Sequence, residues 1–163
     1  AKQARAKLEF ARLAYGASST AGTDFDTREC ERVARLFFEI EKAELDWRVP
    51  LILLPKHKAK LLMNMLLIAA GSVPRGGYVK VEVEGPAGLE RFRLSAKGPK
   101  TSIPSGSEGL LSGAPEDGVD ARGIQPFYTG ILARMTNMSI SIGIANEEFV
   151  LSATPVPVVV EAA

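Results

Sequence analysis

The sequence predicts an α/β sandwich, in which one face of a mixed β-sheet is covered by helices. Residues 61–70 are apolar almost all round, as in a helix that is buried between a sheet and another helix. Residues 78–84 then alternate valines with charged residues, which is typical of a strand with one buried face. Helical and strand patterns follow one another along the rest of the chain, and this order favours a single layered domain.

The first predicted helix covers residues 1–17. Its apolar stripe extends past half of the circumference and consists of Ala4, Leu8, Phe10, Ala11, Leu13, Ala14, Tyr15 and Ala17. A helix this apolar needs partners, and one suitable arrangement is the second arm of a helical hairpin that pairs with a dimer mate in a four-helix bundle. Residues 16–22 are rich in Gly and Ser and are expected to form a flexible connection.

The second predicted helix begins at Asp26 or Thr27, either of which can cap it, and ends near Lys42. A short alternating strand is expected at residues 45–49. The apolar central helix follows and stops at the glycines and the proline of residues 71–77, because Gly tolerates positive φ and Pro cannot continue the hydrogen-bond ladder.

The second half of the chain is predicted to contain a hairpin, a long loop, a helix and two closing strands. In order, these are strands 78–84 and 91–96, an irregular and partly mobile loop at 97–119, a helix at 120–135, and strands at 139–144 and 148–152. Pro155 and Pro157 are expected to lead the tail, residues 155–163, away from the sheet, since Pro cannot pair within a central strand.

The composition excludes several classes of function. The formal net charge is +1, which provides no field that favours nucleic acid or an anionic membrane. No apolar run approaches the roughly 20 residues that span a bilayer, and the first residues lack the layout of a signal peptide, so a cytoplasmic protein without a membrane partner is expected. Cys30 is the single cysteine and cannot form an internal disulfide or a metal cluster.

Residues 60–77 resemble the Asn-box helix of the histidine-kinase ATPase domain, which has the Bergerat fold. Asn64 matches the first Asn of the box, and the Pro-Arg-Gly-Gly stretch matches its end. The second Asn, which in that family holds the Mg²⁺ bound to ATP, is replaced by Ile68. Because isoleucine offers no oxygen ligand to a hard cation, this box cannot bind the metal.

Two further nucleotide-binding boxes of that domain are also altered. Ala96 stands where an Asp accepts a hydrogen bond from the adenine amino group, and Gln125 stands where a glycine lets phosphates approach the backbone. Pro126 has no N–H to offer a phosphate. The resemblance therefore implies a degenerate ATPase-like domain that is neither an ATPase nor an autokinase and has no cofactor or metal. A working ATPase would need ligands from other residues, such as Asn64 and Asp120.

Nearly the whole chain is similar to the alphaproteobacterial histidine phosphotransferase family. The resemblance rests on four stretches, LEFARLAYGA at 8–17, PRGG at 74–77, AKG at 96–98 and QPFYT at 125–129. It implies a homodimer whose four-helix bundle imitates a kinase dimerisation domain. One His of the bundle accepts a phosphoryl group from the receiver domain of a hybrid kinase and passes it to receiver domains of response regulators, without ATP. The implied division is 1–18 as the second hairpin helix, 19–154 as the ATPase-like domain and 155–163 as the tail.

The reactive His of that family lies on the first bundle helix. The resemblance thus places the phosphoacceptor upstream of Ala1 and leaves no catalytic residue in this chain. The one histidine, His57, is interpreted as a solvated surface residue. Its neighbours Lys56, Lys58 and Lys60 are interpreted as a solvated helix start, with attraction to an acidic receiver domain as the alternative.

The first helix supplies the remaining candidate residues. Arg5, Lys7 and Arg12 on its polar flank are expected to contact an acidic partner. The candidates for bundle or dimer contacts are Leu8, Phe10, Leu13 and Tyr15. The sequence thus predicts a histidine phosphotransferase of a two-component phosphorelay, and the alternative is a non-catalytic protein-interaction module built on a degenerate ATPase fold. A His-Asp motif upstream of the chain would separate the two.

Overall fold

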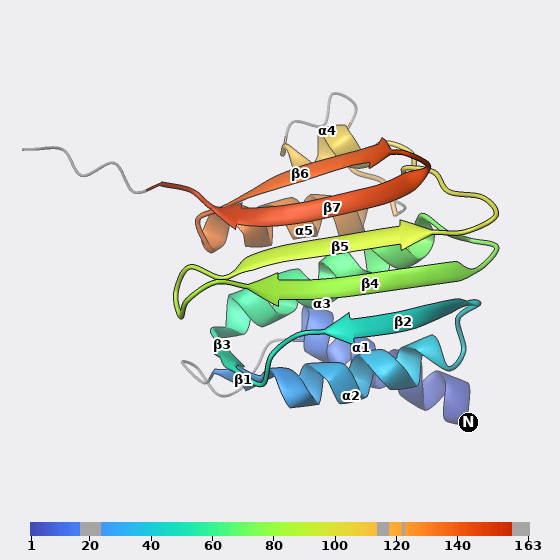
Figure 1. Ribbon diagram of the computed structural model, residues 1–163, viewed down its shortest axis with the longest axis horizontal. Coiled ribbons are helices and arrows are strands. Elements are labelled where there is room, and N and C mark those ends of the chain that lie inside the picture. The colour runs from blue at the N-terminus through green and yellow to red at the C-terminus, as the bar shows by residue number, and fades with distance from the viewer. Residues whose placement is uncertain (17–23, 114–117, 122, 158–163) are drawn as a thin grey trace, which may run out of the picture.

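A five-stranded mixed sheet forms the framework of the molecule. The computed structural model describes residues 1–16, 24–113, 118–121 and 123–157. Within them the strands lie in the order β2-β4-β5-β7-β6, with β2 parallel to β4 and the other neighbours antiparallel. Figure 1 shows the helical layer behind the sheet, which confirms the predicted α/β sandwich.

The elements follow the predicted order, with β1, β3 and α4 as additions. They are α1 (Lys2–Tyr15), β1 (Phe25–Asp26), α2 (Thr27–Phe38), β2 (Ala43–Arg48), β3 (Leu53–Leu54), α3 (Lys56–Gly71), β4 (Gly77–Glu84), β5 (Arg91–Lys97), α4 (Ser107–Leu111), α5 (Ile124–Met135), β6 (Met138–Ala145) and β7 (Glu148–Pro155). β1 and β3 pair as a two-residue bridge, which is too short for alternation to reveal. The predicted flexible connection, from residue 17 to 22, and the boundary after residue 18 lie outside the described residues.

Helix α3 lies at the centre of the core. Most of its apolar run is buried, with Leu67 and Ala70 partly buried. The side chains with no exposed surface include Leu61, Leu62, Met63, Met65 and Leu66. On the sheet, the valines of β4 and the apolar side chains of β5 and β7 point toward the helices and are buried as well. The other face of the sheet carries the charged residues of the alternating pattern.

Two helix boundaries differ from the prediction. Helix α2 ends at Phe38 rather than near Lys42, because the Ile40 N–H donates to the Phe37 carbonyl and tightens the last turn. Helix α5 begins at Ile124 rather than at Asp120. The Gly123 N–H donates to both the carbonyl and the carboxylate of Asp120, so these residues form a turn before the helix.

The loop predicted at 97–119 contains the short helix α4. This helix is held by α5, because an Nη atom of Arg134 donates to the Leu111 carbonyl at 3.3 Å. Gly130 of α5 permits the approach, since a Cβ at this position would collide with the same carbonyl oxygen. The helix depends on these tertiary contacts and is too short to have a sequence periodicity of its own.

Strand β7 continues through Pro155, which was predicted to leave the sheet. Pro155 pairs with Met138 of β6, whereas pairing of β7 with β5 ends at Ala153. Proline is tolerated at this place because no β5 carbonyl lies opposite its missing N–H. The Val156 N–H still donates to the Asn137 carbonyl at 2.9 Å. The part of the predicted tail from 158 onward lies outside the described residues.

The glycines of two motif stretches pack backbone against backbone. Gly76 and Gly77 have φ of +95° and +124°, which favours glycine at both positions. A Cβ at Gly77 would collide with the Lys97 carbonyl, and a Cβ at Gly98 would collide with the Gly76 carbonyl. The turn before β4 and the turn after β5 therefore require glycine for close approach, independently of any nucleotide.

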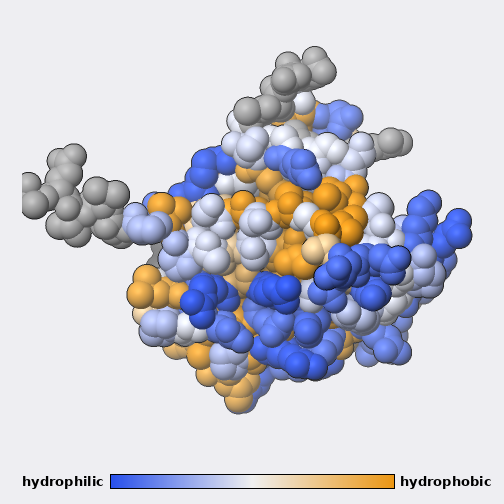
Figure 2. All heavy atoms as spheres, turned by 45° about the horizontal axis from the view of Figure 1, so that its top comes forward, coloured by the Kyte–Doolittle hydropathy of each residue, from blue (hydrophilic) through white to orange (hydrophobic). Residues whose placement is uncertain are grey.

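Apolar side chains reach the surface at the β6 edge of the sheet. A groove of about 510 Å³ lies there between β6, α4 and α5, and its apolar lining is Leu111, Ala133, Met138, Ile140, Ile142 and Val156. Figure 2 shows apolar side chains gathered over this edge, above the more hydrophilic open face of the sheet. The β6 edge is therefore more apolar than the open face of the sheet.

Replacement of Gly98 by Ala tests the backbone packing. We expect Gly98→Ala to lower the free energy of unfolding by about 2–3 kcal/mol, because the turns at 74–77 and 96–98 must separate to admit the methyl group. Urea denaturation followed by circular dichroism measures the change. Gly143→Ala is the matched control, since a Cβ at this β6 position meets no atom within 4 Å. Equal stability of the two variants would contradict the packing argument.

Candidate functional site

The four positions that correspond to nucleotide ligands lie inside the molecule. Asn64 and Ala96 have no exposed surface, Ile68 is 3% exposed, and Gln125 is half-buried. Ile68 and Ala96 belong to the hydrophobic core. They present hydrocarbon at positions where the kinase boxes provide an oxygen ligand to Mg²⁺ or to adenine.

The two polar members of this set connect three helices. The Asn64 Nδ2 atom on α3 donates to the Ala14 carbonyl of α1 at 3.0 Å and to the Lys60 carbonyl at 2.8 Å. The Gln125 Nε2 atom on α5 donates to the Asn64 carbonyl at 2.7 Å. These side chains therefore bridge α1, α3 and α5.

Two tyrosines meet beside this bridge. The rings of Tyr15 on α1 and Tyr128 on α5 have centroids 5.7 Å apart and are tilted by 43°. Burial, with a smaller effect of the neighbouring Tyr128, raises the pKa of Tyr15, and burial raises the pKa of Tyr128. Both hydroxyls thus stay neutral at physiological pH, and the pair is an aromatic contact between the end of α1 and the first turns of α5.

Helix α1 has one face in the core and one face in solvent. Of the predicted bundle residues, Phe10 and Leu13 are 2% and 8% exposed and pack in the core of this chain, whereas Leu8 and Tyr15 are 51% and 43% exposed. The exposed stripe of α1 consists of Ala4, Leu8, Ala11 and Tyr15. Ala11 is half-buried, and the other three side chains are exposed. The predicted partner-binding residues Arg5, Lys7 and Arg12 are all exposed.

An ion-pair network attaches α1 to α2. Arg32 on α2 contacts Glu9 on α1 at 3.0 Å and forms a two-pronged pair with Glu29, at 2.6 Å and 3.0 Å. The side chain of Glu9 is only 29% exposed. This network and the Asn64 bridge hold α1 at two points along its length.

The lysines at the start of α3 are not all solvated, contrary to the prediction. Lys58 and Lys60 are 8% and 6% exposed. The Lys58 Nζ atom pairs with the buried Glu90 carboxylate at 3.1 Å and donates to the Gly88 carbonyl at 3.2 Å. Lys58 therefore fastens the β4–β5 hairpin to α3 and is unavailable to a partner.

The surroundings at this end of α3 shift the pKa values of Glu90 and Lys60. Burial opposes ionisation of the Glu90 carboxyl, but hydrogen bonds from its own N–H, from Lys58 and from the Gly88 N–H outweigh burial and lower the pKa of Glu90. Burial and the nearby Lys56 lower the pKa of Lys60. Among the described residues, no carboxylate pairs with Lys60, so its alkyl chain rather than its charge is what the fold uses.

His57 is exposed, as the sequence predicted. Within the described ranges, no group of three or more His, Cys, Asp and Glu residues lies close enough to hold a metal ion. Every described helix is too short or too polar to cross a bilayer.

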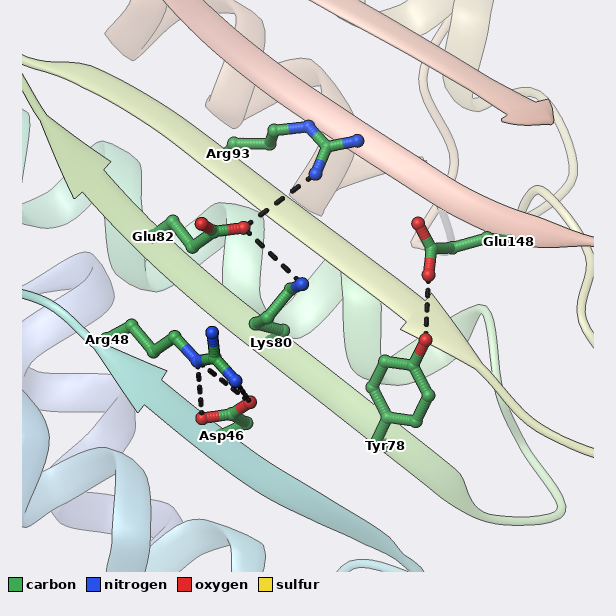
Figure 3. Close-up of polar contacts among 7 residues, drawn as sticks. All are labelled: Asp46, Arg48, Tyr78, Lys80, Glu82, Arg93 and Glu148. Carbon is green, nitrogen blue, oxygen red and sulfur yellow. Dashed lines mark hydrogen bonds and ion pairs between the residues drawn. The ribbon is translucent and has the colours of Figure 1, made fainter. Parts of the chain in front are cut away.

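Charged residues on the open face of the sheet pair with one another. Figure 3 shows them, and the labelled residues are Asp46, Arg48, Tyr78, Lys80, Glu82, Arg93 and Glu148. Glu82 lies 3.7 Å from both Lys80 and Arg93, and the Tyr78 hydroxyl donates to Glu148 at 2.7 Å. Because opposite charges alternate, this face presents a mixed polar surface rather than a field of one sign.

A known family matches most of this chain. The model of the histidine phosphotransferase C-terminal domain matches residues 27–148. The chain belongs to this family. The curated protein phosphotransferase ChpT of Brucella abortus (strain 2308) is 45% identical over 154 residues, which are 94% of this chain and 74% of that relative. The family predicted from the sequence motifs is therefore confirmed.

Solved structures extend the likeness to three dimensions. A bacterial phosphotransferase at 44% identity superposes with a TM-score of 0.86, over 93% of this chain and 73% of that chain. The histidine kinase AdeS of Acinetobacter baumannii has a TM-score of 0.59 at 10% identity, over 93% of this chain and 75% of that chain. At this low identity, the similarity to the kinase shows that the two proteins share a fold and nothing more. The shared fold confirms the predicted ATPase-like architecture.

Sequence reasoning missed the contacts that join distant segments. Lys58 and Glu90 are 32 positions apart, and Tyr15 and Tyr128 lie on the first and last helices. The sequence offered one signal for this ion pair, which is that Lys58 lies on the apolar central helix and Glu90 lies between two strand patterns. No local pattern could have shown that they meet.

Replacement of Glu90 tests the buried ion pair. Glu90→Gln leaves the Lys58 ammonium buried without a carboxylate, and we expect a loss of roughly 3 kcal/mol in the free energy of unfolding at pH 7. Since the pKa of Glu90 is lower in the folded state, its stabilisation is fully present above the unfolded pKa and is lost as the pH falls through the folded pKa. The difference between parent and variant should therefore shrink in acid, as measured by urea denaturation from pH 7 to pH 3.

The control for this variant is Glu84→Gln. Glu84 pairs with Arg91 at 3.9 Å, and both side chains are more than half exposed. A change within about 0.5 kcal/mol is expected, because surface pairs contribute little. A Glu90→Gln deficit that stays constant from pH 7 to pH 3 would exclude the proposed linkage.

Proposed function

We propose that the protein is a histidine phosphotransferase of a two-component phosphorelay and carries a phosphoryl group between receiver-domain aspartates of a hybrid kinase and of response regulators. The observation that carries the proposal is a kinase-like frame in which two nucleotide-ligand positions, Ile68 and Ala96, are apolar and buried in the core. A kinase frame that cannot hold ATP must obtain its phosphoryl group from another phosphorylated protein. Membership of the phosphotransferase family supports the same conclusion.

The transfer chemistry follows from the two acceptors. A neutral imidazole nitrogen attacks phosphorus of the receiver's acyl phosphate, the P–O bond breaks and the Asp carboxylate leaves. The reverse step returns the group to the next receiver, and Mg²⁺ is provided by the receiver's acidic pocket. We assign the phosphoacceptor to a His upstream of Ala1. The reactive His of the family lies on a bundle helix, whereas the exposed His57 lies beside lysines at the start of a helix of the ATPase-like domain. The cytoplasm is the compartment that fits this role.

We infer that the exposed stripe of α1 forms the homodimer interface. The spacing of Ala4, Leu8, Ala11 and Tyr15 is 4, 3 and 4 residues, which is the seam of helices that pack side by side. The opposite face of α1 is buried against α2 and α3. A four-helix bundle uses the exposed stripe without disturbing the core of the chain.

The basic residues of α1 are suited to an acidic receiver domain. Arg5, Lys7 and Arg12 are exposed on the helix that would lie nearest to the phosphoacceptor arm. A receiver gathers acidic side chains around its phosphorylation site to hold Mg²⁺, and exposed positive charge beside the bundle would steer it into place. These three residues are therefore assigned to partner binding.

Phosphoryl transfer tests the function directly. The full-length gene product is incubated with a phosphorylated receiver domain in the absence of ATP, and acid-labile phosphate on the protein is expected within minutes. Label should persist in His57→Ala, and added ATP with Mg²⁺ should neither label the protein nor change the rate. Lys7→Glu with Arg12→Glu should raise the receiver KM about tenfold, whereas Arg91→Glu on the open sheet face should not.

Each alternative has its own result. Label lost in His57→Ala would overturn the assignment of the phosphoacceptor. Label obtained from ATP alone would refute the claim that the protein does not use ATP. If no receiver transfers phosphate, the chain acts as a non-catalytic interaction module instead.

Leu8→Arg tests the dimer. The variant places a charge in the centre of the proposed seam on both subunits, and we expect the dimer Kd to rise at least 100-fold, which corresponds to about 2.7 kcal/mol. Sedimentation equilibrium measures it. The matched control is Leu89→Arg, since Leu89 is 58% exposed in the β4–β5 hairpin. A dimer that survives Leu8→Arg, or one that Leu89→Arg dissociates equally, would contradict the assignment.

A further inference from the structure

We propose that Asn64 is a positioning residue that holds α1 in one orientation on the domain, and that Gln125 is a second positioning residue that acts on α1 through Asn64. The clamp is defined by the bridge from Ala14 through Asn64 to Gln125. Its contribution to phosphoryl transfer rests on the proposed function, whereas its mechanical role does not.

The α1 side of the clamp fixes the amide of Asn64. The Ala14 carbonyl lies in the last turn of α1, where carbonyls lack a donor within the helix. The fully buried Nδ2 of Asn64 provides that donor and directs its second hydrogen to the Lys60 carbonyl. A flipped amide would set Oδ1 against two carbonyl oxygens, so the side chain has one satisfactory orientation. The end of α1 is thereby tied to the middle of α3.

The α5 side adds the third helix. The Gln125 side chain leaves the first turn of α5 and donates from Nε2 to the Asn64 carbonyl at 2.7 Å. Beyond this bond, the rings of Tyr15 and Tyr128 close the same junction. Residues of α1, α3 and α5 therefore meet around one asparagine. A movement of α1 would break the buried hydrogen bond from Asn64 to Ala14. Gln125 acts on that bond through the Asn64 side chain, because its Nε2 atom lies 3.5 Å from Asn64 Oδ1.

A second attachment prevents α1 from rotating. Glu9 contacts Arg32 of α2 at 3.0 Å, one and a half turns before Ala14, at a separation of roughly 7–8 Å along the helix axis. Phe10 and Leu13 are buried between the two attachments. A helix held at two points and by its buried face cannot turn about its own axis. The exposed stripe that starts at Ala4 and the basic flank therefore keep fixed directions relative to the domain.

This rigidity has a consequence for transfer. If α1 belongs to the bundle that carries the phosphoacceptor, the clamp sets where the domain lies beside a docked receiver. Loosening it should leave receiver binding intact and lower the rate at saturation, because reacting groups are then aligned for less of the time.

Distance measurement between spin labels tests the clamp in the chain itself. Labels at Lys7→Cys on α1 and Glu84→Cys at the end of β4 are both exposed, and native Cys30 is fully buried with its thiol pKa raised to about 12 by burial. With excess unlabelled protein present to suppress distances between subunits, the parent should give one narrow distribution.

The decisive variants lie at the half-buried Gln125, which is less prone than Asn64 to prevent folding. Gln125→Met removes the donor and should broaden the distribution at least twofold. Gln125→Lys keeps a donor within reach of the Asn64 carbonyl and should restore the narrow distribution. Gln3→Met, on the exposed part of α1, is the matched control and should not change it. A narrow distribution in Gln125→Met would overturn the clamp.

Transfer kinetics on the full-length gene product test the positioning role. Gln125→Met should lower kcat about tenfold at unchanged receiver KM, and Gln125→Lys should recover it. A broadened distance distribution with normal kcat would overturn the role in transfer and leave the mechanical clamp. Absence of transfer in the parent would refute the proposed function, while the spin-label distances would still decide the clamp.

Discussion

The burial of most of helix α3, from Lys58 to Ala69, is the constraint on which the rest of the structure depends. A helix that is apolar all round has no face to offer to water, so each of its sides must be covered by another element. The sheet covers one side, and α1, α2 and α5 cover the others. For this reason α1 is integrated into the core through Phe10 and Leu13, even though it would also be an arm of a hairpin. The covering leaves Ile68 only 3% exposed.

Burial of α3 also determines what happens to its few polar groups. Lys58 and Asn64 cannot remain in the core without partners, because each unpaired group would cost free energy. Glu90 satisfies the first, and carbonyls of α1 and α3 satisfy the second. Asn64, which matches the first Asn of the kinase box, is part of the internal hydrogen bonding.

Local patterns predicted the elements that are long and periodic, and they failed where tertiary contacts decide. The central helix and strands 78–84 and 91–96 were found because their apolar residues recur with periods of about 3.6 and 2. The bridge of β1 and β3 and the helix α4 were missed, since two or five residues cannot show a period. The lysines at the start of α3 were misjudged, because a charged residue on a helix end is usually solvated and only the return of the β4–β5 hairpin buries Lys58.

By itself, the sequence determined the α/β class, the family and the loss of the nucleotide ligands, because these depend on residue types at fixed local spacing. Ile68 and Ala96 cannot coordinate Mg²⁺ or pair with adenine in any fold. Only the tertiary structure decided which face of α1 is free, which lysine is paired, and what Asn64 and Gln125 contact. These outcomes depend on segments brought together from up to 113 positions apart, as for Tyr15 and Tyr128. Such contacts arise from burial of whole faces, which no short pattern of residues encodes.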